Sequence, residues 1–156
     1  IASCLVGSEM CIRDSNAFGL LSQNTSSGYG ILARFYQASV AAQAGDVLEA
    51  IRIYDRITND SSTPETMKGL ATVLASFKAL DVPSIKAETI RMKLQPMSIA
   101  GQSFRHVALE ILALNEQRAG DIEAARSNYR AIVDDPSAAT GIRSRAAQML
   151  KLLSAS

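Results

Sequence analysis

The chain has 156 residues, of which 47% are hydrophobic and 20% charged, and 16 basic residues against 15 acidic ones give a formal net charge of +1. This length suits one domain with a hydrophobic core, and the apolar fraction is too high for a disordered chain. The even charge balance gives no electrostatic case for nucleic-acid binding, and no apolar run reaches the roughly 18 residues that a transmembrane helix needs.

Residues 1–27 differ from the rest of the chain. Residues 1–15 show neither helical nor strand periodicity, and either the tail of a signal peptide or a non-native segment would explain them. Cys4 and Cys11 lie in this segment at a spacing that matches no zinc or thioredoxin-like motif. Residues 22–28 are polar and Ser-rich, which is typical of a linker. We therefore expect residues 1–27 to be a doubtful or non-native N-terminal segment and linker, and residues 28–156 to be the folded domain.

Apolar residues recur with helical spacing along the rest of the chain, and no stretch shows the alternation of a strand. Val47, Ala50, Ile51 and Tyr54 illustrate the pattern, since they fall on one face of a helix. Thr63 and Pro64 form a cap and first-turn pair that opens the third helix. The sequence therefore predicts an all-α fold with seven helices, at about residues 28–44, 46–59, 64–80, 84–95, 102–119, 121–133 and 138–153.

An internal repeat organises these helices, and it makes Gly120 the equivalent of Gly45. Ala-Gly-Asp at 44–46 recurs at 119–121, and each copy is followed by an alanine and then a tyrosine at the same distances. The glycine follows an apolar helical stretch, where a left-handed residue ends a helix, and the aspartate is placed to cap the next helix. A small alanine one turn further on lets two helices approach, and the tyrosine fills the wider gap beyond it. Each copy therefore predicts a tight helical hairpin.

Residues 44–54 and 119–129 resemble the centre of tetratricopeptide repeats, which have Gly-Asp at the hairpin turn, Ala in the second helix and Tyr or Phe four residues on. The Trp and Leu-Gly of the family's first helix are not matched, and the closing proline is present only as Pro136. The middle hairpin, residues 64–95, lacks the turn motif. The resemblance implies a divergent, tetratricopeptide-like solenoid of helical hairpins with a non-catalytic role in protein–protein interaction.

A narrower resemblance covers residues 28–153 and rests on residues 28–34, 94–96, 101–114 and 141–146. Their order is similar to the tetratricopeptide-like domain of YfgM-type proteins, the ancillary subunits of the bacterial SecYEG translocon, particularly the alphaproteobacterial branch. That family has one N-terminal transmembrane helix and a helical domain in the periplasm. The resemblance implies a place at the periplasmic side of the inner membrane, through an anchor outside this chain. It also implies protein partners (the Sec translocon, secreted clients or periplasmic chaperones).

In the resembled repeats, the first helix of each hairpin lines a concave groove that binds protein segments. The residues that fall on this face are Phe35, Tyr36, Ser39 and Gln43 in the first copy, and Glu110, Ile111, Leu114, Gln117 and Arg118 in the second. We take them as the candidate protein-binding groove. The alternative is that a later helix covers this face.

Nothing in the sequence forms a convincing catalytic, cofactor or metal set. His106 is the single imidazole, and the G-x-S-x-G elbow that would accompany a Ser-His-Asp triad is missing. Asp60 and Asp135 fall at helix ends, where capping explains them better than catalysis by paired carboxylates. The alternatives to an interaction module are a generic repeat scaffold or oligomerisation domain and, less favoured, a small helical enzyme that uses His106.

Overall fold

A computed structural model of the chain describes residues 28–154. These residues form seven α-helices and one short 3-10 helix, with no strand, which confirms the all-α prediction. The helices are α2 (Gly28–Gln43), α3 (Val47–Asn59), α4 (Glu65–Ala79), α5 (Ala87–Leu94), η1 (Gln95–Met97), α6 (Arg105–Ala119), α7 (Ile122–Val133) and α8 (Thr140–Ser154).

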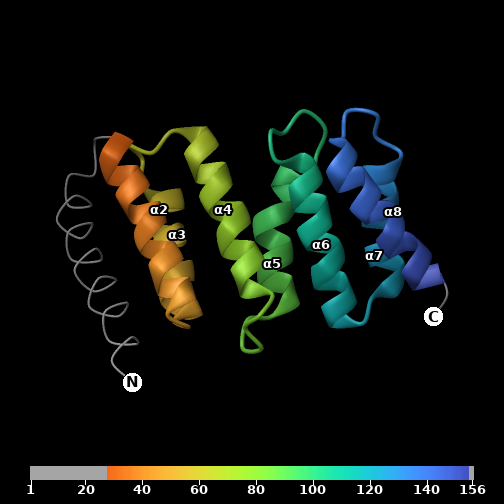
Figure 1. Cartoon of the computed structure of the whole chain (residues 1–156), viewed down its shortest axis with the longest axis horizontal. Coiled ribbons are helices and arrows are strands. Elements are labelled where there is room, and N and C mark those ends of the chain that lie inside the picture. Colours follow the sequence, from red (N-terminus) through yellow and green to blue (C-terminus); the bar gives the residue numbers. More distant parts are fainter. Residues whose placement is uncertain (1–27, 155–156) are drawn as a thin grey trace, which may run out of the picture. The chain divides into compact units, whose positions relative to one another are not determined.

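The chain divides into two compact units between Lys78 and Ala79. In the first unit α2 packs against α3, and a contact of 3.3 Å between the hydroxyls of Thr58 and Thr72 joins α3 to α4. In the second unit α6 packs against α5 on one side and against α7 and α8 on the other (Figure 1). Each unit contains one copy of the internal repeat, so that α2, α3 and α4 correspond to α6, α7 and α8.

Both hairpin turns are built as the Gly-Asp motif predicts. Gly45 and Gly120 have φ angles of +88° and +84°, the left-handed region in which a side chain is strained. The carboxylates of Asp46 and Asp121 each accept a hydrogen bond from the backbone N–H three residues further on, at 3.1 and 3.0 Å. The glycine thus ends one helix and the aspartate caps the next.

The small and large positions of the repeat are buried as expected. Ala50 and Ala125 are 0% exposed, and Tyr54 and Tyr129 are 4% and 1% exposed. Around Tyr129 the second unit has a continuous apolar core drawn from α6, α7, the following turn and α8. Its buried members are Leu109, Ala113, Ala125, Tyr129, Ile132, Ala138, Ala146 and Leu153.

The middle of the chain departs from the predicted boundaries. The sequence predicts a helix over 84–95, but α5 begins at Ala87 because the backbone N–H of Ile85 turns back to the carbonyl of Val82. The chain then continues as η1, in which Pro96 is tolerated near the first turn. Likewise α6 begins at Arg105 rather than 102, after Gly101 with φ +88°.

Candidate functional site

An exposed apolar stripe runs along α2. Tyr29, Leu32 and Tyr36 lie three and four residues apart and are 81%, 54% and 42% exposed. Residues at this spacing share one face of a helix. The buried residues of α2 are different ones: Gly30, Ile31, Ala33, Arg34 and Ala38. Because three large apolar side chains on one face is more than scattered surface exposure, this stripe is a candidate interaction surface.

The structure separates the four candidate groove residues of the first copy. Tyr36 and Gln43 are exposed, whereas Phe35 and Ser39 are half-buried. The Phe35 ring packs against the Tyr54 ring of α3, with centroids 5.9 Å apart and an interplanar angle of 54°. Phe35 therefore contributes to the α2–α3 contact, and Tyr36 is the large predicted groove residue that is partly exposed, at 42%.

In the second copy the corresponding residues make contacts within the unit. The Glu110 carboxylate accepts two hydrogen bonds from Arg145 of α8, at 2.8 and 2.9 Å. The Gln117 side chain accepts one from the Tyr129 hydroxyl at 3.0 Å. Burial, with a smaller effect of the Glu110 charge, raises the pKa of Tyr129 to about 12. Ile111 is 3% exposed. Arg145 and Tyr129 belong to α8 and α7, so these contacts favour the alternative that a later helix covers this face in the second unit. Leu114 is half-buried there as well.

Arg118, the last of the predicted groove residues, binds the loop of residues 79–85 that leads into α5. Its guanidinium donates to the backbone carbonyls of Ala79, Leu80, Val82 and Ile85, at 2.9 to 3.4 Å. A planar cation with several N–H donors suits a row of carbonyls, and cations are favourable where a helix ends. Arg118 therefore shapes the connection that leads into α5.

Asn115 and Glu116, which precede Arg118 on α6, join this helix to α5. Neither is among the site residues predicted from the sequence. Glu116, 3% exposed in its side chain, accepts from Nε and Nη2 of Arg91 at 3.0 and 2.5 Å. These hydrogen bonds, with the Glu116 charge, hold the pKa of Arg91 above its usual value. The Asn115 amide donates to the Ala87 carbonyl at 3.1 Å. The only indication of these contacts in the sequence is a polar residue on an otherwise apolar helix face.

His106 contacts the turn between α7 and α8. Its Nε2 lies 2.9 Å from Oδ2 of Asp135, which also pairs with Arg105, while Oδ1 accepts from the backbone N–H and hydroxyl of Ser137. The hydrogen bonds from Ser137, together with that from His106 and the charge of Arg105, lower the pKa of Asp135. The arrangement explains His106 as a residue that fixes the start of α6 to this turn.

The first unit has an equivalent turn, in which Asp60 takes the place of Asp135 and Arg34 is its cationic partner. Asp60 accepts from the backbone N–H and hydroxyl of Ser62 at 2.9 and 2.6 Å, and from Arg34 of α2 at 2.9 Å. The Ser62 hydrogen bonds, followed by Arg34, lower the pKa of Asp60 to about 2. Asp60 and Asp135 are equivalent positions of the repeat, so the Asp-X-Ser turn belongs to both copies. Both aspartates lie at helix ends, as predicted.

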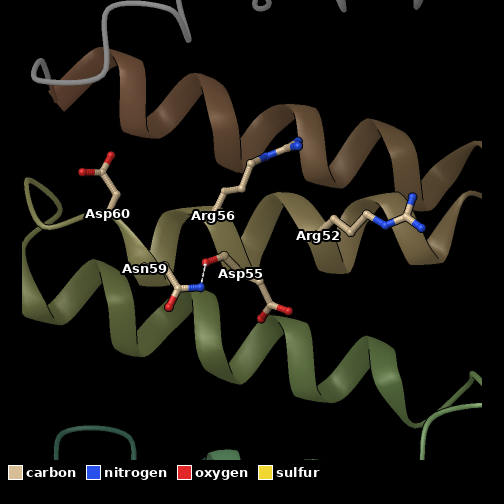
Figure 2. A pocket seen from close by; sticks show the side chains of 5 residues that line it. All are labelled: Arg52, Asp55, Arg56, Asn59 and Asp60. Atoms are coloured by element: carbon tan, nitrogen blue, oxygen red, sulfur yellow. Dashed lines mark hydrogen bonds between the residues drawn. The ribbon is translucent and has the colours of Figure 1, made fainter.

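A surface hollow of about 470 Å³ lies along α3, lined by Arg52, Asp55, Arg56, Asn59 and Asp60 (Figure 2). Arg52 and Arg56 also pair with Glu49 at 3.5 and 3.0 Å. Two arginines and two aspartates line the hollow, so their charges cancel and the hollow favours neither anionic nor cationic ligands.

Within residues 28–154, no group of three or more His, Cys, Asp or Glu side chains is placed to bind a metal ion. Every helix in this range is too short or too polar to cross a membrane. Cys4 and Cys11 fall outside the described residues. No family model matches the chain, no curated protein matches it, and no solved structure matches it.

Proposed function

We propose that this chain is a non-catalytic helical-repeat module, of divergent tetratricopeptide type, that binds protein segments. The observation that carries the proposal is the exposure of Tyr29, Leu32 and Tyr36 on one face of α2. Aromatic residues in such a patch are typical anchors of protein interfaces, since they bury a large area at a small cost in conformational entropy. Gln43 at the end of the same helix adds a polar group at the rim.

In this proposal the two copies of the repeat have different roles: the second supports the fold and the first binds the partner. In the second copy, Glu110, Gln117 and Arg118 are engaged by Arg145, Tyr129 and the 79–85 carbonyls, so this copy is an internal support. In the first copy Tyr29, Leu32 and Tyr36 of the equivalent helix are exposed. Binding is therefore assigned to the first copy alone, and Phe35 acts in it through its contact with Tyr54.

The cellular setting of the proposal comes from the resemblance to YfgM-type proteins. On that basis the module is the periplasmic domain of a membrane-anchored protein in the translocon and chaperone network. Its partners are then the Sec translocon, secreted chains or periplasmic chaperones.

Site-directed photo-cross-linking tests this function. A photoreactive residue at Gln43 of the full chain should form adducts with identifiable proteins, and Leu32→Asp should abolish them because a charge is placed in the apolar stripe. Leu48→Asp is the matched control, since Leu48 of α3 is 46% exposed in the same unit and lies outside the stripe. Adducts unaffected by Leu32→Asp would overturn the proposal. Adducts with proteins outside secretion would overturn the cellular setting alone.

A further inference from the structure

Another surface hollow lies in the second unit, where the connection after residue 79 leads into α5. Its volume is about 440 Å³. This value falls within the roughly 300–1,000 Å³ that is typical of small-molecule pockets. The residues that line it all belong to the second unit: Leu80, Pro83, Ile85, Lys86, Ala87 and Arg118.

The charge of this hollow is unbalanced. Lys86 and Arg118 are cationic, and none of the described residues that line the hollow is acidic. Asp81 and Glu88 are close in sequence but do not line it, and Glu88 pairs with Arg91 on α5. Neither Lys86 nor Arg118 forms an ion pair with another of the described residues. Unlike the hollow along α3, this one therefore favours an anion.

The two cations offer an anion different interactions. The Nη atoms of Arg118 donate to backbone carbonyls, among them that of Ile85 at 2.9 Å. Carbonyl oxygens carry no net charge, so these hydrogen bonds fix the guanidinium in place without neutralising it. Lys86 is exposed, and its ammonium has three donors and no acceptor among the described residues. Lys86 can therefore donate hydrogen bonds to an anion, while Arg118 stabilises its charge.

The rest of the lining is aliphatic. Leu80, Ile85 and Ala87 are half-buried and Pro83 is exposed, and none of these four has a polar side chain. None of the described lining residues is aromatic, so they offer no ring on which a base could stack. A ligand that matches the whole hollow has one anionic group and an aliphatic chain.

We propose that this hollow binds a small aliphatic carboxylate, with its carboxylate at Lys86 and Arg118 and its chain along Leu80, Pro83 and Ile85. A monoanion fits better than a phosphate, because carbonyls already occupy the Nη donors of Arg118 and a phosphate requires more hydrogen bonds than remain. The hollow is separate from the stripe on α2, so this site goes beyond the proposed protein binding and does not depend on it.

Titration with octanoate, followed by NMR shifts of the full chain, tests the site. We expect saturable shifts at residues 80–87 and Arg118, with tighter binding than acetate because the longer chain removes more apolar surface from water. Octylamine has the same chain with a positive charge and should not bind. Equal binding of octylamine would overturn the anionic site, and equal binding of acetate would overturn the role of the aliphatic lining.

Substitutions separate the two halves of the site. Lys86→Gln should weaken octanoate binding by about tenfold, the effect of losing one charge-assisted hydrogen bond, and Lys86→Arg should retain it. Lys151→Gln is the matched control, since Lys151 is an exposed lysine of the same unit outside the hollow. Ile85→Ser keeps the backbone carbonyl that Arg118 binds, so it should weaken octanoate but not acetate binding. Equal losses in Lys86→Gln and Lys151→Gln would refute the assignment.

The carboxyl terminus of a protein carries the same anionic group and is distinguished by a peptide. An acetylated tripeptide ending in leucine should bind more weakly than octanoate. If instead it binds more tightly at residues 80–87, and its amide does not bind, the small-molecule proposal is overturned. Failure of octanoate to bind would leave the adducts at Gln43 unaffected, so this proposal and the proposed function fail independently.

Discussion

Removing Arg91 is expected to destabilise the second unit strongly, because it leaves the Glu116 carboxylate buried without its cation. The Glu116 side chain is 3% exposed and accepts two hydrogen bonds from Arg91. Breaking a buried pair by removing one partner costs about 3–5 kcal/mol. The Arg91 side chain is 36% exposed, so water partly hydrates the stranded carboxylate, and we expect about 2–4 kcal/mol for Arg91→Met.

The destabilisation caused by losing the Arg91–Glu116 pair can be measured separately from the loss of the other contact of Arg91. Arg91 also pairs with Glu88 one turn earlier on α5, an exposed pair worth about 0.3–0.5 kcal/mol. Glu88→Gln measures this smaller contribution. The double variant Arg91→Met with Glu116→Leu removes both charges of the pair. It should recover most of the lost free energy of unfolding, since an apolar pair of similar volume replaces an ion pair with a buried carboxylate at little cost.

Urea denaturation followed by circular dichroism is the assay, with the shift read from the midpoint at a constant slope. If the two units unfold in separate transitions, the shift should fall on the transition of the second unit. A loss below about 1 kcal/mol in the single variant, or a double variant no more stable than the single one, would refute the reasoning.

Two further outcomes follow from the turns. Asp121→Ala should cost about 1 kcal/mol in the free energy of unfolding, because the first turn of α7 loses its cap; Asp121→Asn, which keeps an acceptor, should cost less in the same urea assay. Asp60 has a pKa of about 2, lowered by Ser62 and Arg34, so its stabilising effect is complete above about pH 4 and is lost as the pH falls towards 2. Asp60→Asn should flatten the acid limb of a stability–pH profile, and an unchanged limb would contradict the assignment of the Ser62 and Arg34 contacts.

Local features of the fold could be predicted from the sequence. The left-handed Gly45 and Gly120 and the capping Asp46 and Asp121 depend on backbone geometry within a few residues, and their side chains suffice to specify it. The burial of Tyr129 follows from helical periodicity. The all-α class and the seven α-helices of residues 28–154 follow from helical periodicity and from the turn residues between the helices.

The contacts that decide the site could not be predicted in this way. The pairing of Arg91 with Glu116 joins residues 25 apart, and its geometry exists only once α5 lies against α6. Gln117 and Arg118 fall on a predicted groove face, yet tertiary packing gives them intramolecular partners. The repeat places Tyr36 on the correct helix, but its exposure and the burial of Ile111 at the equivalent position depend on what lies next to each helix.

The way Arg118 holds the 79–85 connection has a consequence for how this segment tolerates sequence change. Its four acceptors are backbone carbonyls, which every amino acid possesses. Leu80 and Asp81 can therefore be substituted without changing the backbone conformation of the loop. Replacement of Arg118 removes all four hydrogen bonds together. A saturation-mutagenesis map should show that Leu80 and Asp81 tolerate substitution, whereas Arg118, which lies 33 to 39 residues away on α6, does not.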